Sequence, residues 1–485
     1  MIEAHKFWLT FAFFCVWLLG LFVGFRDLPM VDLPQHSTLL ELWLHWGNPF
    51  RGDQYYELNL NTPCVVTYFI ARLLAPLMGA VVAWKVVAWA AVVGNALMLT
   101  LLAKRLGHSP WLGLLGFPTG LCHAYYFGFL SFLFSTPFAI GCWLLALQHT
   151  SRPTLKRGLA LASLLCFTLL AHAIAFCIGA MGAGFLLLAG QGRFWQRLAP
   201  LVAPVALIAL WVLPGRSTRS IGGTDWRIPW DQILDLPASL VGMYRGDQLA
   251  TLGGLFILAT ALLHAYRPSR SIWRWGPLLV TVAGYCLFPA SVSGFAWLHA
   301  RFVGFVIPAL LVACDPVSNT STSRGVWRAP GWVVGVCSVW LVVFGVRLAR
   351  FNEQTQDFHA LVATLPPGLS VRPIVFERES EAFPTVPALL HFPAYYQVQK
   401  GGTQGYSFAI YPGSIIRFRE PWVLPVIPPG SEWHPETFDA PSEVPFYDCF
   451  MVHSSSDRSE ELFVDSPVPI TLVARSGSWW AYRRE

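Results

Sequence analysis

Long apolar stretches separated by short polar connections fill the first 350 residues of the chain. A helix that crosses a bilayer needs about 20 mostly apolar residues. Stretches of this kind cover residues 7–25, 80–103, 110–122, 124–148, 159–170, 173–188, 199–213, 249–265, 275–287, 302–313 and 331–348. The pattern predicts an α-helical polytopic membrane protein with about eleven transmembrane helices.

The pattern changes after residue 350. Short β-rich runs lie between breaks such as Pro366-Pro367-Gly368 and Pro428-Pro429-Gly430, at residues 371–376, 422–427, 446–453, 470–474 and 479–483. Such runs, bounded by turn residues, are typical of strands. We therefore expect a transmembrane domain over residues 1–350 and a small C-terminal α/β domain over 351–485, preceded by a helix over 352–365.

Basic residues indicate the orientation of the chain in the membrane. Lys and Arg gather in alternate short connections, and such loops are cytoplasmic as a rule. We expect a cytoplasmic N-terminus in the cell (inner or plasma) membrane, outer loops over residues 26–79 and 215–248, and an extracytoplasmic C-terminal domain. The basic residues are Lys104, Arg105, Arg152, Lys156, Arg157, Arg193, Arg197, Arg267, Arg270, Arg274, Arg324 and Arg328.

Composition agrees with this reading. Hydrophobic residues make up 55% of the chain and charged residues 12%, which leaves too little polar surface for a soluble globule of 485 residues. Much of the net charge of +6 is accounted for by the basic loops, so nucleic acid is not an expected partner. Eight of the ten cysteines lie in or beside apolar stretches. Only Cys64 and Cys449 remain as a pair outside the membrane, a weak basis for a disulfide.

The first outer loop carries the best candidates for chemistry. Pro34 can open a helix there, and Asp32 just before it would lie where a helix N-terminus favours an anion. His36 is four residues further on and can share the face of Asp32. Leu39, Leu40 and Trp43 suit a helix that lies in the membrane interface. The simpler interpretation makes Asp32 a helix cap and His36 a solvated interfacial residue.

Several motifs together resemble a known superfamily. The first outer loop with its Asp is followed by Tyr55, Tyr56, Thr62 and Pro63, a Tyr-Phe-Gly-Phe-Leu run over 126–130, a turn at His172, and Arg301-Phe302 with Pro308 in a late span. This layout resembles the GT-C superfamily of polytopic glycosyltransferases, such as the protein O-mannosyltransferases and aminoarabinose transferases. Many members carry an Asp-Glu pair, where this chain has Asp32 with His36 and Asp27 nearby.

The resemblance implies transfer of a sugar from a polyprenyl-phosphate donor to a glycan, lipid or protein acceptor at the outer face. Asp32, with His36, would deprotonate the acceptor. Arg301, His299 and Arg245 would hold the donor phosphate, because guanidinium groups match its oxygens.

The sequence also offers three secondary candidates for the site and leaves the presence of a metal ion undecided. Asp27, His172 and Lys85 are the secondary candidates, although His172 suits a turn and Lys85 suits a residue that reaches for the membrane surface. A divalent cation such as Mg or Mn could bridge Asp32, His36 and phosphate, but one carboxylate and one imidazole make a thin ligand set.

Two other classes of function fit a polytopic chain. A transporter or flippase for a lipid-linked saccharide would carry ionisable groups near the middle of the bilayer, and broken helices in matched halves. The candidate residues here gather toward one predicted face instead. A non-catalytic assembly protein of the same fold is the third class, and in it the outer domain would do the binding.

Overall fold

The computed structural model describes residues 2–190, 193–212, 223–264, 267–292, 295–316, 330–419 and 427–485. The chain divides into two compact units. Unit 1 comprises Met1–Gly24, Val86–Thr218 and Gly223–Gly345, and unit 2 comprises Phe25–Lys85, Arg219–Gly222 and Val346–Glu485. Most of the strand predicted at 422–427, the basic residues Arg324 and Arg328, and the start of the predicted loop 215–248 lie outside the described residues.

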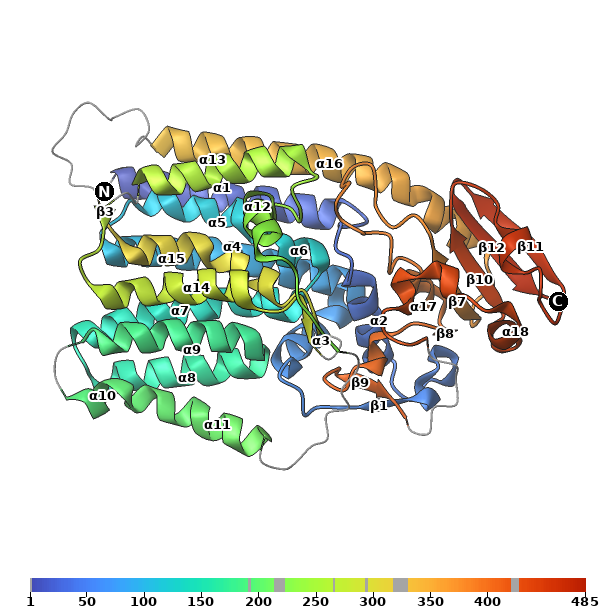
Figure 1. The fold of residues 1–485 in the computed structure, drawn as a ribbon, viewed down its shortest axis with the longest axis horizontal. Helices are drawn as coiled ribbons and strands as arrows, with labels where there is room; N and C mark the ends of the chain where they lie inside the picture. The colour runs from blue at the N-terminus through green and yellow to red at the C-terminus, as the bar shows by residue number, and fades with distance from the viewer. Residues whose placement is uncertain are drawn as a thin grey trace. The chain divides into compact units, whose positions relative to one another are not determined.

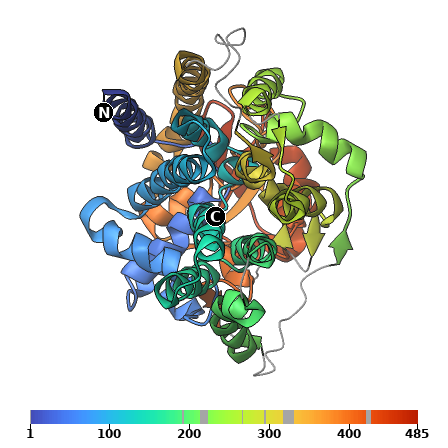
Figure 2. The same ribbon diagram turned by 90° about the vertical axis from the view of Figure 1, so that its left-hand side faces the viewer.

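Unit 1 is built from helices, most of which lie nearly parallel to one another. They run across Figure 1 and are seen nearly end-on in Figure 2. The helices are α1 (Ile2–Gly24), α4 (Ala80–Leu106, which begins in unit 2), α5 (Gly116–Gly120), α6 (His123–Phe127), α7 (Leu130–Ser151), α8 (Leu155–Ala171), α9 (Ala173–Leu188), α10 (Phe194–Leu198), α11 (Val202–Val212), α12 (Pro229–Ser239), α13 (Gln248–His264), α14 (Gly276–Leu287), α15 (Val306–Ala313) and α16 (Pro330–Thr364, which ends in unit 2).

Shorter elements join these helices. The 3-10 turns are η3 (Pro110–Leu115), η4 (Ala199–Leu201), η5 (Ile272–Trp275) and η6 (His299–Phe305). Strands β2 (Thr224–Asp225), β4 (Ser291–Val292) and β5 (Phe295–Ala296) form a small sheet, and β3 (Arg267–Pro268) pairs with β6 (Cys314–Asp315).

Small residues allow the central helices to pack closely. Helix α9 lies against α7, and a Cβ placed on Gly182 would come within 2.2 Å of Trp143 Nε1. A Cβ on Gly179 would lie 3.0 Å from the Cα of Ala139. Such contacts bring helix backbones together where lipid provides no hydrophobic drive for association.

Among the described residues, the predicted apolar stretches lie in helical segments, but the stretch predicted over 124–148 is divided between α6 and α7 at Gly128, which has φ 84°. In the described part of the chain, four helices are long and apolar enough to cross a membrane: Ala4–Gly24, Ala80–Leu106, Leu130–Ser151 and Pro330–Thr364. Shorter apolar helices occupy Val65–Met78, Ala173–Leu188, Phe194–Leu210, Gln248–His264 and His299–Ala313. The chain is a multi-pass membrane protein. The number of eleven spans stays a prediction.

Helix α16 corrects one predicted boundary. The span predicted over 331–348 and the helix predicted over 352–365 form one continuous helix of 35 residues. No proline interrupts the sequence between them, and the helix stops just before Leu365 and the Pro366-Pro367 pair, which cannot continue it. At 1.5 Å per residue the helix is roughly 50 Å long, so it exceeds the hydrocarbon thickness of about 30 Å.

Unit 2 combines the predicted first outer loop with the C-terminal part of the chain. Its helices are α2 (Leu33–Leu44), α3 (Val65–Met78), α17 (Ala394–Lys400), α18 (Ala440–Glu443) and α19 (Ser459–Leu462). Its 3-10 turns are η1 (Pro49–Arg51), η2 (Asp53–Tyr55), η8 (Phe408–Ile410), η9 (Ser431–Trp433), η10 (Pro435–Thr437) and η11 (Val444–Phe446). The domain boundary at residue 350 stays a prediction.

A mixed sheet of five strands has the order β11-β12-β10-β7-β8. Strand β7 is parallel to β10 and β8, while β12 is antiparallel to β10 and β11. The strands predicted at 371–376, 446–453, 470–474 and 479–483 are confirmed, with adjusted ends. They are β7 (Ser370–Val375), β10 (Cys449–His453), β11 (Ile470–Ser476) and β12 (Trp479–Arg484), and the fifth strand, β8 (Thr403–Gln404), was not predicted.

Two kinds of contact hold unit 2 together. One face of the sheet packs on a core that includes Val444, Phe450 and Trp480. Strand β1 (Tyr56–Leu58) from the loop pairs antiparallel with β9 (Ile416–Phe418). The first polar loop is therefore folded into the same unit as the C-terminal sheet. Cys64 and Cys449 are not joined to each other, so the suggested disulfide is not formed.

Candidate active site

Asp32 lies where the sequence predicts it, directly before helix α2 with Pro34 in the first turn, but its side chain does not cap the helix. Its Oδ1 accepts a hydrogen bond from Nδ1 of His391 at 3.1 Å. Both side chains are buried. The carboxylate therefore forms a buried ion pair or hydrogen bond with a histidine 359 residues away in the sequence.

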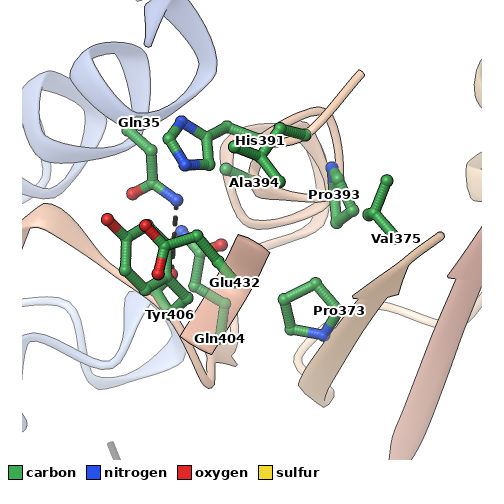
Figure 3. Close-up of a pocket in the computed structure, with 10 residues that line it drawn as sticks. Gln35, Pro373, Val375, His391, Pro393, Ala394, Gln404, Tyr406 and Glu432 are labelled. Carbon is green, nitrogen blue, oxygen red and sulfur yellow. Dashed lines mark hydrogen bonds between the residues drawn. The ribbon is translucent and has the colours of Figure 1, made fainter. Parts of the chain in front are cut away.

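A small pocket lies beside this pair. Figure 3 shows the ring of His391 beside Gln35, with Tyr406, Glu432 and Gln404 grouped below them. Gln35 donates from Nε2 to the carbonyl of Tyr406 at 3.3 Å. Burial raises the pKa of Glu432, although the charge of His391 acts in the opposite direction. Burial also raises the pKa of Tyr406, so its hydroxyl stays protonated at neutral pH.

His36 has a different environment from the one predicted. Its Nδ1 is 2.6 Å from the hydroxyl of Tyr68, and its ring lies against those of Trp84 and Phe408. Helix α2 is also more enclosed than an interfacial helix. Trp43, expected to face the headgroups, is buried, and Thr38 donates to the carbonyl of Ala394 on α17. Contact of Trp43 with the headgroups is therefore not borne out, because tertiary packing inside unit 2 covers the apolar face of this helix.

Asp27 belongs to a second aspartate–histidine pair in unit 2. Its Oδ2 accepts hydrogen bonds from His359 Nε2 and from Thr355 Oγ1, each at 2.8 Å. Its backbone N–H donates to Oδ1 of Asn352 at 2.9 Å. These partners lie on the C-terminal half of α16, so Asp27 fastens the start of the loop to that helix.

Lys85 does not reach for a membrane surface. It is 2% exposed, and its Nζ donates to the carbonyls of Phe25 at 2.8 Å and Arg26 at 2.6 Å. The lysine therefore holds the start of the first loop, which is a structural task. That expectation fails because the sequence does not reveal that two loop carbonyls lie beside the start of α4.

Arg301 and His299 lie close together in unit 1. Both are in η6 and buried, and the guanidinium carbon of Arg301 is 3.7 Å from the ring centre of Phe129. The charges of Arg301, His299 and Arg227 all act on the buried His123. These four cationic or titratable side chains form what we call the basic cluster.

Arg245 has acidic partners. Its Nη2 lies 2.8 Å from Oδ1 of Asp231, and its Nε is 3.8 Å from Oδ1 of Asp235. Asp235 also pairs with Arg227 at 3.3 Å. Arg245 is thus tied to the basic cluster through a shared carboxylate, and much of its charge is balanced there.

His172 occupies the turn between α8 and α9. Its Nδ1 accepts a hydrogen bond from the backbone N–H of Ile174 at 3.2 Å, and the ring lies edge-on to Phe132. This is the turn role that the sequence suggests. The charge of Arg301 still acts on its imidazole, so His172 lies near the basic cluster.

Sequence reasoning missed four residues that the structure places at these sites: His391, Glu432, His123 and Arg227. None sits in a recognisable motif, and His391 and Glu432 are separated from Asp32 by more than half of the chain. The only available signal was chemical, because buried titratable groups cluster at functional sites.

The part of the chain that the structure describes contains no cluster of side chains suited to a metal ion. Within it, no group of three or more His, Cys, Asp or Glu side chains could hold an ion. Asp32 and His391 alone supply two ligands, and the metal dependence of the protein stays open.

Comparison with known protein structures identifies the fold of the chain. No family model matches the sequence, and no curated protein sequence does. The structure of ArnT from Cupriavidus metallidurans, an aminoarabinose transferase, matches with a TM-score of 0.58 over 99% of this chain and 98% of that one, at 11% identity. The chain has the GT-C fold. The same ArnT bound to undecaprenyl phosphate matches with a TM-score of 0.57.

A second GT-C glycosyltransferase supports this result. The mycobacterial arabinofuranosyltransferase AftD matches with a TM-score of 0.50 at 12% identity, over 98% of this chain and 40% of AftD. The resemblance to the GT-C superfamily seen in the sequence is thereby confirmed for the fold. At such low identity, the roles of individual residues rest on the geometry described above.

Proposed function

We propose that this protein is a membrane glycosyltransferase that moves a sugar from a polyprenyl-phosphate donor to an acceptor at the outer face of the membrane. The observation that carries the proposal is a buried carboxylate, Asp32, in the loop after the first helix of a GT-C fold. Fold alone does not define function. Asp32 adds the chemistry, because it is buried, paired with a histidine and next to a polar pocket.

The donor phosphate would be bound by the basic cluster of unit 1. As the sugar leaves, negative charge gathers on the phosphate, and fixed cations in a site of low polarity stabilise it most. Arg301 has the planar fork that matches phosphate oxygens, and its stack on Phe129 fixes the plane of that fork. Arg227 takes the place that the sequence gave to Arg245, because Arg245 is the more engaged with carboxylates.

The acceptor would be activated in unit 2. An acceptor hydroxyl must lose its proton as it attacks the sugar, and a positioned side chain typically accelerates such a step by about 10²–10⁴-fold. Asp32 and His391 together offer a carboxylate and an imidazole for this task. His36 would help to shape this region through Tyr68 and Trp84.

The topology belongs to the same proposal. About eleven spans, a cytoplasmic N-terminus and an outer C-terminal domain would place Asp32 and unit 2 outside the cytoplasm. The length of α16 agrees with a helix that leaves the bilayer and continues into unit 2.

Transfer can be tested with purified protein and radiolabelled polyprenyl-phosphate sugars. We expect release of polyprenyl phosphate together with labelled acceptor when a membrane extract supplies acceptors. The same protein in liposomes, with the donor confined to one leaflet, separates a flippase from a transferase. Movement of intact donor between leaflets without cleavage would show that the protein is a transporter. Binding of the donor without cleavage or movement would support the non-catalytic assembly protein.

A further inference from the structure

Unit 2 contains two buried aspartate–histidine pairs, and they differ in one respect. In the Asp27 pair, both ring nitrogens of His359 have partners: Nε2 bonds to Asp27, and Nδ1 lies 3.3 Å from Nε2 of Gln399. In the Asp32 pair, Nδ1 of His391 is held by the carboxylate, while Nε2 has no hydrogen-bond partner among the described residues. His391 is 4% exposed, so bulk water does not satisfy that nitrogen freely.

The imidazole of His391 is also fixed in orientation. Its ring stacks on Tyr406 with a centre-to-centre distance of 5.2 Å and an interplanar angle of 22°. Phe408 meets the ring edge-on at 5.5 Å. With Asp32 holding Nδ1, the ring presents Nε2 to the pocket, and Figure 3 shows that edge of the ring turned toward the side of Glu432. A buried polar atom that is left unpaired at a fixed position is a functional candidate.

The pocket walls indicate what chemistry this nitrogen meets. Gln404, Tyr406 and Glu432 line it, and among the described residues that line it there is no Lys or Arg. Such walls suit a neutral hydroxyl-bearing group and disfavour a phosphate or carboxylate. The anionic donor phosphate therefore belongs to another site, and this pocket fits the hydroxyl of a sugar-like acceptor.

We propose that His391 is a catalytic base in the transfer reaction and that Asp32 orients it. This inference rests on the proposed function and deepens it. The acceptor O–H bond breaks and its proton moves to Nε2 of His391, while the acceptor oxygen forms a bond to the anomeric carbon of the donor sugar. The bond from that carbon to the phosphate oxygen breaks, and polyprenyl phosphate leaves with the electron pair. Asp32 stabilises the imidazolium through Nδ1–H, as the carboxylate of a hydrolytic triad does.

The groups that face His391 are consistent with this role. Asp32 lies at Nδ1, Glu432 lies within electrostatic range, and the Tyr406 ring covers one face. Tyr411 lies behind Tyr406, with the two hydroxyls 3.1 Å apart. Two carboxylates therefore favour a positive imidazolium after the proton is transferred, and no basic side chain among these neighbours opposes it.

Two substitutions separate a base from a positioning residue. The amide nitrogen of asparagine lies as many bonds from Cα as Nδ1 does, so His391→Asn can keep the bond to Asp32 but lacks Nε2. If His391 only positions Asp32, His391→Asn should retain most of the activity. If Nε2 is the base, we expect kcat to fall by about 10²-fold or more, with the KM for the lipid donor close to wild type.

The pH profile gives a second readout. Protonation of Nε2 blocks an imidazole base, so its activity falls as pH is lowered. We expect an acid limb in the wild-type profile that is absent from the residual activity of His391→Asn. His359→Gln is the matched control, because its amide nitrogen can keep the bond to Asp27. It should leave the profile unchanged.

The two proposals can fail separately. If wild type transfers sugar but His391→Asn keeps kcat and pH profile, His391 is not the base and the proposed function stands. If wild type transfers no sugar from any polyprenyl-phosphate donor, the proposed function itself fails. Thermal unfolding of each variant, and donor affinity measured directly with the labelled lipid, show whether a loss of rate comes from misfolding. A folded His391→Asn that binds donor but turns over slowly supports the proposal, and an unfolded one shifts the test to His391→Gln with the same readouts.

Discussion

At the residue scale, Asp32 has a defined partner in place of the helix cap that its position before Pro34 suggests. Replacing it with asparagine removes the charge opposite His391 but keeps the size of the side chain. We expect Asp32→Asn to lower kcat by about a hundredfold or more while donor binding persists, because either role, base or orienting carboxylate, needs the negative charge. Asp439→Asn, an exposed carboxylate of unit 2, is the control. Near-normal turnover of Asp32→Asn would return Asp32 to a structural role.

Arg301 tests the basic cluster. Lysine keeps the charge but loses the fork and the stack on Phe129. We expect Arg301→Lys to raise the apparent KM for the lipid donor by about tenfold or more, because one charge-assisted hydrogen bond contributes about 1.5–3 kcal/mol. Arg347 is a matched control, since it is also buried and stacks on Phe383 with 4.6 Å to the ring centre. Equal donor affinity in wild type and Arg301→Lys would make Arg301 a packing residue.

The buried carboxyl of Glu432 in the pocket makes the stability of the fold depend on pH. Because burial raises the pKa of its carboxyl in the folded chain, the folded chain binds that proton more tightly than the unfolded chain does. Its contribution to stability is therefore full at low pH and is lost as pH rises through the raised pKa. We expect Glu432→Gln to raise the Tm at pH 7 and to leave it nearly unchanged at pH 4. Glu460→Gln, an exposed control, should show no such difference, and an equal effect at both pH values would contradict the argument.

At the scale of elements, α16 is the helix on which unit 2 depends. Asp27 binds Thr355 and His359 on the half of α16 that extends beyond the predicted span. Asp27→Asn should destabilise the protein by about 1–3 kcal/mol, because it weakens buried hydrogen bonds to a charged group. Donor affinity should not change. Thermal unfolding in detergent measures the loss, with Glu353→Gln on the exposed side of the same helix as control. A Tm equal to wild type would show that this contact is dispensable.

The buried contacts of Asp27 make it unsuitable as a control for substitutions of Asp32. As a neighbour of Asp32 in the sequence, it suggests itself as a mild control for the loss of a carboxylate. In the structure it is 2% exposed and carries its own histidine, so its replacement has a structural cost. An exposed aspartate is therefore the better control for Asp32.

At the scale of the whole molecule, orientation in the membrane decides which leaflet supplies the substrates. The alternation of basic loops predicts an outer C-terminus. A reporter that is active only outside the cytoplasm, fused after Glu485, should be active. A cytoplasmic reporter at the same position should be silent, and activity of that second fusion would invert the topology and with it the proposed side of the reaction.

The sequence by itself determined the class of the protein and much of its local structure. In lipid, the backbone polar groups of a long apolar stretch must be paired within the protein, and a helix pairs them within the stretch itself. The positions of such helices can therefore be predicted without tertiary information. The same holds for the strands at residues 371–376 and 479–483, where β-rich runs are bounded by turn residues. Asp32 and Arg301 stood out because charged groups next to apolar stretches are costly and rarely accidental.

Only the tertiary structure decided which partners these residues meet. His391 reaches Asp32 across 359 positions, and no local pattern encodes such a pairing. Lys85 turned out to hold loop carbonyls, and α2 turned out to be buried, because both depend on what packs against them. Periodicity reports which face of an element is apolar. It does not report what covers that face, and the chemistry of a site depends on that.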